Sequence, residues 1–252
     1  MTQSTTTQDA ALMTMARWVS TIADNIRNPI SGISAALSIL EHQLRSSDTD
    51  LDSTTPLVDD ALARIRLRLT SLSEYVSELI DFAKPAVIQP SPTDLNSLVN
   101  ATKNQTLRDL PGVQVATKFS CRTSTVKADH DRLRIVLSGI MRNAAEAALT
   151  TTSQNKPQVS IAVDCTHEGF TITVSDNGPG FSKDAMHHAC EPFYSTKEAG
   201  TGLGLAIAAK VVRAHGGEIT IGKSTSLGGA KVSLYLPESR KSGPDHLLLP
   251  VT

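Results

Sequence analysis

Two long runs of regularly spaced apolar residues occupy the first third of the chain. Between about residues 9 and 46, apolar side chains recur every three or four positions, which places them along one face of a helix. The polar segment SSDTDLDSTTP interrupts this run, and a second stripe continues from Pro56 until Lys84 and Pro85 end it. The stripes are Val19, Ile22, Ile26, Ile30, Ile33, Leu37, Leu40 and Leu44, and then Val58, Leu62, Ile65, Leu69, Leu72, Val76 and Leu79.

The two stripes predict an antiparallel helical hairpin. One hairpin cannot cover both stripes on all sides, and pairing two copies into a four-helix bundle is the cheapest way to bury them. We therefore predict a homodimer in which residues 9–84 form the dimerisation domain, preceded by a flexible tail of residues 1–8. The alternative is a monomeric hairpin that folds back on the chain's own C-terminal domain.

Helical and strand patterns alternate in the rest of the chain. Proline-rich KPAVIQPSPTD cannot continue a helix and predicts a linker at residues 85–92. Residues 93–237 then predict an α/β domain with a mixed sheet covered by helices, so the overall fold class is α+β. The expected helices are 95–107, one capped by Asp129 or Asp131, and LGLAIAAKVVRAHGG; the expected strands are 113–119, 159–163, 170–174, GEITIG and AKVSLYLP.

Composition excludes several classes of partner and location. The 24 basic and 25 acidic residues give a net charge of −1, so no electrostatic patch for nucleic acid or an anionic membrane is predicted. No apolar run is long enough to span a membrane, and the opening MTQSTTTQDA does not resemble a signal peptide, so we expect a cytoplasmic protein. We interpret Cys121, Cys165 and Cys190 as thiols outside any disulfide framework. Residues 238–252 are predicted as a tail, either disordered or docked through HLLLPV.

Three segments of the α/β domain concentrate polar and glycine residues. Asn143 in RNAAEA carries an amide oxygen that suits a hard cation such as magnesium. Asp176, Gly178 and Gly180 in VSDNGPGF follow a strand, which fits either a ligand site or an ordinary turn. The segment GTGLGLA opens a helix, so its backbone N–H groups and the helix dipole suit phosphate oxygens.

These segments together resemble a known family. NAAEA, DNGPG, EPFYSTK and GTGLGL, in this order, are similar to the N, G1, F and G2 boxes of sensor histidine kinases, and NIRNPISGI resembles their H box. The resemblance covers residues 9–237 and implies a Bergerat-type sandwich that binds ATP with Mg²⁺. It assigns Asn143 to magnesium and Asp176 to the adenine amino group, beside Gly178 and Gly180. The residues assigned to the phosphates are Lys197, Gly200, Thr201, Gly202, Leu203 and Gly204.

The same resemblance assigns residues 191–197 to a mobile lid over the nucleotide. Phe193 would seat that lid against the domain, and ordinary core packing is an equally good interpretation of this aromatic residue. The implied partner is a response regulator or a partner kinase. No nucleic acid and no membrane are expected as partners.

The H box departs from the family at the residue that matters most. Asp24 stands at the position of the phospho-acceptor histidine, and Asn25 replaces the acidic residue that follows it. A solvated carboxylate is a poorer nucleophile than a neutral imidazole, so self-phosphorylation at this position is predicted to be lost. Asn28 stands where relatives place the residue that orients water against a phosphorylated response regulator, so phosphatase activity remains open beside a simple packing role.

Other functions stay open as alternatives. A conventional autokinase would need an acceptor elsewhere, and none of the seven histidines lies in such a box. A gyrase-like ATPase clamp would need a general base one turn before Asn143, where this chain has Gly139. A module that only binds other proteins would explain the hairpin and leave the ATP boxes unused.

Overall fold

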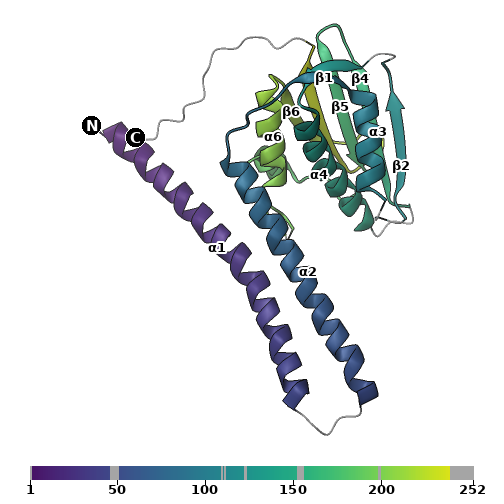
Figure 1. Cartoon of the computed structure of the whole chain (residues 1–252). Helices are drawn as coiled ribbons and strands as arrows, with labels where there is room; N and C mark the ends of the chain where they lie inside the picture. Colours follow the sequence, from purple (N-terminus) through teal and green to yellow (C-terminus); the bar gives the residue numbers. More distant parts are fainter. Residues whose placement is uncertain are drawn as a thin grey trace. The chain divides into compact units, whose positions relative to one another are not determined.

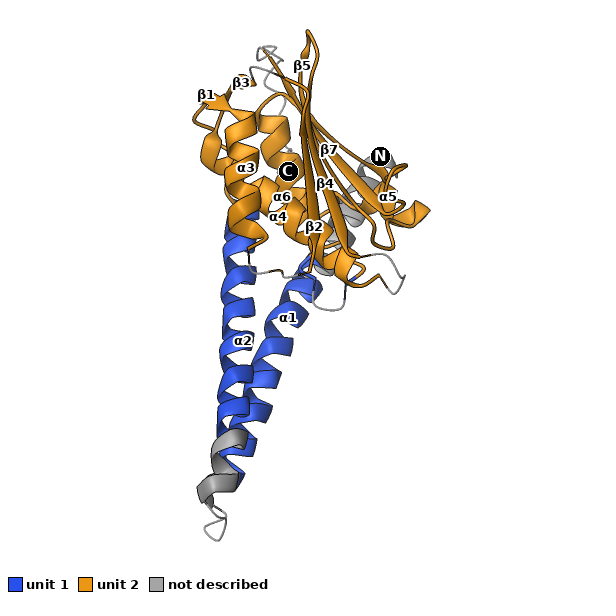
Figure 2. Ribbon diagram, turned by 90° about the vertical axis from the view of Figure 1, so that its right-hand side faces the viewer, with its two compact units in different colours: residues 1–83, 197–201 blue, residues 84–196, 202–252 orange. Residues whose placement is uncertain are grey.

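A computed structural model describes residues 2–45, 51–108, 110, 112–121, 124–151, 156–197 and 200–238. The chain forms two compact units, which Figure 2 colours separately. The first comprises residues 1–83 and 197–201, and the second comprises residues 84–196 and 202–252. The predicted C-terminal tail lies outside the described residues from residue 239 onward.

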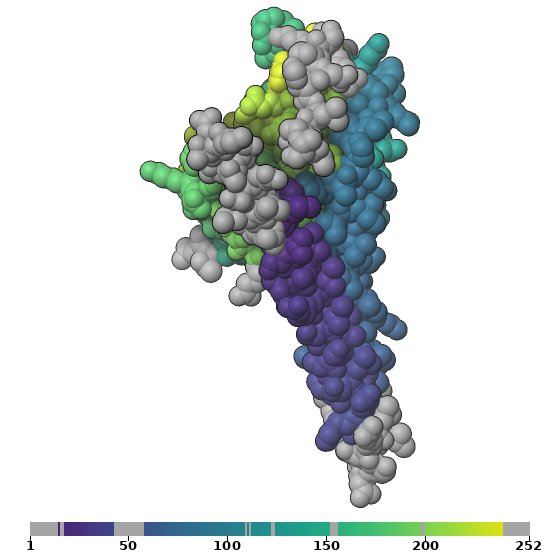
Figure 3. Space-filling view, turned by 90° about the vertical axis from the view of Figure 1, so that its left-hand side faces the viewer, coloured from purple at the N-terminus to yellow at the C-terminus, as the bar shows by residue number. Residues whose placement is uncertain are grey.

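Two long helices build the first unit. Helices α1 (Thr2–Arg45) and α2 (Leu51–Ala83) lie side by side, as Figure 3 shows. The hairpin is confirmed, although α1 already begins in the residues predicted as a tail. Helix α2 begins at Leu51, before Pro56. Within the described part of the chain, neither helix nor any other is long and apolar enough to cross a membrane.

The hairpin buries only part of its apolar surface. Ala36, Ala61 and Tyr75 are buried where the helices meet, and Trp18 packs edge-on against Phe82 with ring centroids 6.3 Å apart. Among the side chains of the hairpin that the structure describes, ten large apolar ones stay at least 40% exposed, and several belong to the two predicted stripes. They are Met15, Val19, Ile30, Leu37, Ile39, Leu62, Leu67, Leu69, Val76 and Ile80.

The second unit is a five-stranded mixed sheet with helices against one face (Figure 1). The strand order is β2-β4-β5-β7-β6; β2 is parallel to β4, and the other neighbours are antiparallel. The predicted α+β class is confirmed. The elements are α3 (Leu95–Thr106), β2 (Gln114–Phe119), α4 (His130–Leu149), β4 (Gln158–Cys165), β5 (Gly169–Asp176), α5 (Lys183–His188), α6 (Gly204–Ala214), β6 (Glu218–Lys223) and β7 (Ala230–Pro237).

Alternation along the strands places the core between the sheet and helices α3, α4 and α6. Val159, Ile161 and Val163 on β4 are fully buried, whereas the residues between them are partly exposed. The hydrophobic stripe of α4, which includes Leu133 and Leu137, packs in the same core. Asp129 caps α4 through a hydrogen bond from the N–H of Arg132, as one of the two predicted caps.

A small second sheet precedes the main one. Strands β1 (Ser91–Asp94) and β3 (Thr125–Ala128) pair antiparallel, and β1 begins inside the segment predicted as a linker. Asp94 then caps α3, because its Oδ1 accepts hydrogen bonds from the N–H of Asn96 and the hydroxyl of Ser124. The Ser124 hydroxyl is the main reason that the pKa of Asp94 is lowered.

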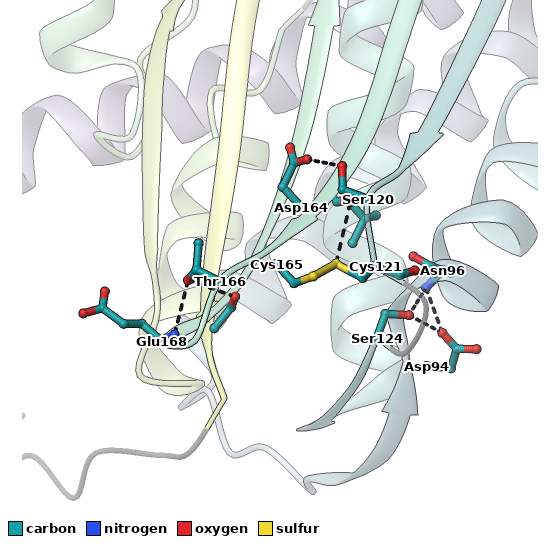
Figure 4. The surroundings of a disulfide bond; sticks show 11 residues. Asp94, Asn96, Ser120, Cys121, Ser124, Asp164, Cys165, Thr166 and Glu168 are labelled. Atoms are coloured by element: carbon teal, nitrogen blue, oxygen red, sulfur yellow. Dashed lines mark hydrogen bonds between the residues drawn. A yellow bond between two sulfur atoms is a disulfide. The ribbon is translucent and has the colours of Figure 1, made fainter.

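A disulfide joins the ends of two neighbouring strands, so the expectation that all three cysteines are unpaired thiols was wrong. Cys121 and Cys165 are bonded (Figure 4), with their Cα atoms 5.8 Å apart. Cys190 is free. The parallel pairing of β2 with β4 brings the two chain segments together. Ser120 strengthens this contact, because its N–H donates to the carbonyl of Val163 and its hydroxyl donates to Asp164.

Candidate functional site

Asp176 ends β5 and is the most deeply buried carboxylate among the described residues, with 3% of its surface exposed. Its Oδ1 accepts two backbone hydrogen bonds, from Gly178 N at 2.8 Å and from Ala230 N at 3.1 Å. Burial raises the pKa of Asp176, and the two N–H donors oppose this shift. No described residue donates a hydrogen bond to Oδ2, which leaves this oxygen as a free acceptor.

The glycines after Asp176 are required by close backbone contacts. A Cβ on Gly178 would lie 2.6 Å from the carbonyl oxygen of Ala147 at the end of α4. Gly180 has a φ of +74°, which other residues rarely adopt. The segment after β5 therefore lies against the end of α4 at Gly178, and at Gly180 it adopts a backbone conformation that favours glycine.

Two residues that no sequence motif singled out, Gly229 and Ala230, hold Asp176 from the other side. Gly229 donates its N–H to the Asp176 carbonyl at 3.1 Å, and Ala230 donates to the side chain. A Cβ on Gly229 would lie 2.3 Å from Oδ1 of Asp176. The glycine pair in SLGGAKV, directly before a predicted strand, was the available signal for a close backbone approach.

Asn143 lies on the exposed side of α4, between buried Met141 and Ala144. A Cβ built on Gly204 would lie 3.9 Å from Nδ2 of Asn143, so the start of α6 approaches this amide. The second unit therefore brings the magnesium candidate close to the glycine-rich start of a helix. This arrangement suits a metal ion that accompanies phosphate groups.

Phe193 and Gly202 are locked together through their backbones. Phe193 is the only described non-glycine residue with a positive φ, at 66°, and its N–H donates to the Gly202 carbonyl at 3.0 Å. A Cβ on Gly202 would lie 2.4 Å from the carbonyl carbon of Phe193. Leu203 is fully buried beside this contact, and the Phe193 ring is half-buried. Phe193 thus holds the start of α6 through its backbone, and the two interpretations of its side chain stay predictions.

The remaining phosphate candidates divide between the units. Lys197, Gly200 and Thr201 belong to the first unit, and the intervening residues 198 and 199 are not described. The second unit by itself therefore contributes Asn143, Asp176, Gly178, Gly180, Gly202, Leu203 and Gly204.

Asp24 and Asn28 are both exposed on α1. Oδ1 of Asp24 lies 3.4 Å from Nη1 of Arg27, and the two side chains are 58% and 71% exposed. An ion pair this exposed contributes little to stability, and the carboxylate remains solvated. Asn25 instead turns inward: its Nδ2 is buried, as is the Tyr75 hydroxyl, and Asn25 lies close enough to this hydroxyl to oppose the rise in its pKa that burial causes. The acidic neighbour of the family's acceptor is thus replaced by an amide inside the hairpin.

Two family models match the chain in the expected order. Residues 14–86 match the His Kinase A (phospho-acceptor) domain, which includes Asp24 and Asn28. Residues 128–240 match the Histidine kinase-, DNA gyrase B-, and HSP90-like ATPase, which includes Asn143, Asp176 and the glycine-rich segment. Together the two matches cover most of the chain.

Histidine kinases are also the relatives that the chain resembles over most of its length. It is 28% identical to the signal transduction histidine-protein kinase AtoS of Escherichia coli (strain K12), covering 94% of this chain and 37% of AtoS. It is 29% identical to the sensory histidine kinase/phosphatase NtrB of Rhizobium leguminosarum bv. phaseoli, covering 84% of this chain and 56% of NtrB. The chain thus spans only about a third to a little over half of these relatives.

Solved structures share the fold. Histidine kinase ThkA, crystallised in complex with the response regulator protein TrrA, matches with a TM-score of 0.71 and 20% identity over 93% of this chain and 65% of that chain. Full-length ShkA in complex with AMPPNP matches with a TM-score of 0.57 and 22% identity over 88% of this chain and 47% of that chain. With both family models matched in order over a helical hairpin and the α/β ATPase domain that follows it, the chain has a histidine kinase core.

Proposed function

We propose that this chain binds ATP with Mg²⁺ and acts on a response regulator or a partner kinase without phosphorylating its own hairpin. The observation that carries the proposal is a contrast between two carboxylates. Asp176 is buried and held by two backbone N–H groups, as a base-recognising acceptor should be. Asp24, at the family's acceptor position, is exposed and paired with Arg27.

Two parts of the second unit would hold the nucleotide: Asp176 at the end of β5 and the glycine-rich start of α6. Asp176 would accept a hydrogen bond from the adenine amino group, and the start of α6 at Gly202 and Gly204 would face the phosphates. The family resemblance assigns Lys197, Gly200 and Thr201 to the phosphates as well, and this assignment stays a prediction. The match to an ATPase model and the AMPPNP complex of ShkA support this assignment.

Asn143 would supply the protein ligand to Mg²⁺. The described residues contain no cluster of three or more His, Cys, Asp or Glu that would hold a metal by itself. This fits a magnesium ion that takes few protein ligands and most of its coordination from phosphates and water. The bound ion would neutralise phosphate charge, while Asn143 orients it at the start of α6.

Loss of the acceptor follows from the chemistry of the side chain. A histidine acceptor attacks the terminal phosphate through a neutral imidazole nitrogen. The Asp24 carboxylate is solvated, is paired with a guanidinium, and would yield an acyl phosphate instead. Asn25 adds to the loss, because an amide inside the hairpin cannot replace the acidic residue that follows the family's histidine.

Asn28 keeps a phosphatase role open. Its side chain is exposed four residues after Asp24, on the surface where the family's response regulators are expected to dock. The relative NtrB is named a histidine kinase/phosphatase, and ThkA was crystallised with a response regulator. Both support a response regulator as the partner. The competing role for Asn28 is that of a polar residue beside Pro29.

A homodimer is the expected form of the hairpin domain. The exposed apolar residues of α1 and α2, such as Val19, Leu37 and Leu69, would be covered by a second hairpin in a four-helix bundle. We propose residues 9–84 as this domain and 93–237 as the ATP-binding domain. The linker at 85–92 then ends within β1.

The alternatives find less support. A relocated acceptor would not be His215, which is buried with Nδ1 bonded to the Val211 carbonyl and Nε2 accepting the Asp129 N–H. An ATPase clamp lacks its general base, because Gly139 has no side chain. A purely protein-binding module would not need a buried Asp176 that is held by the backbone N–H groups of three residues.

The test combines labelled ATP with purified response regulators. Wild-type protein incubated with ATP labelled at the γ-phosphate should carry no acid-labile, base-stable phosphate. Its phosphatase activity should be measured on a phosphorylated response regulator, with Asn28→Ala as the probe and Ser31→Ala as the control on the same exposed face. Faster dephosphorylation that Asn28→Ala alone abolishes supports a phosphatase, and transfer of label to the regulator supports a trans-acting kinase. A phosphohistidine on the wild-type chain would contradict the proposal.

A further inference from the structure

The environment of Asp176 distinguishes its two carboxylate oxygens. Oδ1 accepts hydrogen bonds from the backbone N–H groups of Gly178 and Ala230, at 2.8 and 3.1 Å. Oδ2 accepts none from any residue that the structure describes. The main chain of Asp176 is held as well, because Gly229 N donates to its carbonyl oxygen at 3.1 Å. The carboxylate is therefore fixed through Oδ1, while Oδ2 keeps its capacity to accept a hydrogen bond.

Gly229 allows its backbone to lie directly against residues 176–178. A Cβ at this position would lie 2.3 Å from Oδ1 and 2.5 Å from the carbonyl oxygen of Asp176, and 2.6 Å from Gly178 N. All three distances are below 3 Å, so position 229 has no room for a side chain. Two of the three atoms belong to the backbone and cannot move aside as a flexible side chain could. Any larger residue at position 229 must push the 176–178 segment away.

We propose that Gly229 and Ala230 are specificity-determining residues, whose backbone fixes which atom of residue 176 faces the base of the nucleotide. The inference rests on the proposed ATP binding and deepens it. The two backbone N–H groups donate to the inner atom of residue 176, so only an oxygen, which accepts, satisfies them there. The outer position then determines whether the site accepts a hydrogen bond from the base or donates one to it.

With aspartate, the outer atom is an oxygen and accepts from the 6-amino group of adenine. With asparagine, the two N–H donors would still select the amide oxygen for the inner position, so Nδ2 would face outward as a donor. An amino group opposite Nδ2 is a mismatch, whereas the 6-oxo group of hypoxanthine is a match. Asp176→Asn should therefore reverse the base preference instead of merely weakening binding.

Gly229 is tested separately from Asp176. Gly229→Ala should displace the carboxylate and lower ATP affinity by at least about tenfold, because a polar contact with the base is lost. Binding through the phosphates is common to all nucleoside triphosphates, so the ratio of the affinities for ATP and inosine triphosphate should approach one. Gly222→Ala is the matched control, because Gly222 lies in the same β6–β7 hairpin and a Cβ there meets nothing within 4 Å.

The experiment measures the affinities of ATP and inosine triphosphate by calorimetry, with thermal melting and circular dichroism to check folding. Wild-type and Gly222→Ala proteins should prefer ATP by at least about tenfold, and Asp176→Asn should prefer inosine triphosphate. An Asp176→Asn protein that still prefers ATP would overturn the inference. So would a folded Gly229→Ala protein with wild-type affinity and preference.

If Gly229→Ala does not fold, the reversal in Asp176→Asn decides the question alone. The inference and the proposed function fail in different ways. A wild-type protein that binds ATP while Asp176→Asn shows no reversal refutes only the orientation of residue 176. A folded wild-type protein that binds neither nucleotide refutes the proposed function and this inference with it.

Discussion

Breaking the Cys121–Cys165 disulfide should destabilise the protein strongly while leaving nucleotide affinity unchanged. The bond spans a sequence separation of 44 residues. In the chain-entropy model, a loop of this length restricts the unfolded state enough to stabilise the fold by about 4 kcal/mol. Cys165→Ser, or reduction of the wild type, removes this restriction. Ser120 should hold the strand ends together in either case, through its bonds to Val163 and Asp164.

Nucleotide affinity should be unaffected because the bond and Asp176 lie at opposite ends of the β4–β5 hairpin. Asp176 pairs with Val159, whereas Cys165 pairs with Phe170. Six residues of strand separate the two ends of β5, which corresponds to about 20 Å. Loss of the disulfide at one end of the hairpin should therefore not move Asp176 at the other end, as long as the strand pairing stays intact.

The assay is urea unfolding followed by circular dichroism, with and without reductant, together with calorimetry of ATP binding. Cys165→Ser should unfold about 4 kcal/mol more easily than the oxidised wild type and should not respond to reductant. Cys190→Ser is the control and should keep the full redox dependence, since Cys190 is free. A wild type whose stability changes by less than about 1 kcal/mol on reduction would refute the reasoning.

Four further outcomes are expected. Burial raises the pKa of Asp176 above that of an ordinary aspartate, and protonation would place a donor O–H on Oδ2 opposite the adenine amino group. ATP affinity measured by calorimetry should therefore fall on acidification at a higher pH than an ordinary aspartate would give. Gly139→Ala should raise the free energy of unfolding in urea by about 1 kcal/mol, because nothing lies within 4 Å of the new Cβ and alanine favours the helix. Gly202→Ala should lower it by at least about 2 kcal/mol, because its φ is +67° and the Cβ would strike Phe193. Leu69→Glu should convert the proposed dimer to a monomer in sedimentation equilibrium, whereas Leu149→Glu, at an exposed apolar position on α4, should not.

Local patterns were sufficient to predict most of the elements. The two helical stripes, the alternating residues of β4 and β5, and the cap at Asp129 are each determined by neighbours a few positions apart. The glycine-rich segments were equally visible, because close backbone approach requires glycine at Gly178 and Gly202 whatever the rest of the chain does.

Long-range pairing accounts for what was missed. Strands β1 and β3 have four residues each and pair across about thirty positions, so neither carries a readable period. The disulfide depends on the register of β2 against β4, which a cysteine count does not contain. Gly229 and Ala230 reach Asp176 only because β7 lies next to β5 in the sheet. In each case tertiary arrangement decided the role of residues that look ordinary in sequence.

The most direct test of a lost acceptor beside an intact ATP site is phosphohistidine formation from ATP labelled at the γ-phosphate. It compares the wild type with a variant in which the acceptor histidine is restored. The wild type and Asp24→Asn should acquire no acid-labile, base-stable phosphate. The double variant Asp24→His and Asn25→Glu should acquire it, and adding Asp176→Asn should remove it again. Phosphohistidine on the wild-type chain, or no label on a folded double variant, would contradict the account of an intact ATP site beside a lost acceptor.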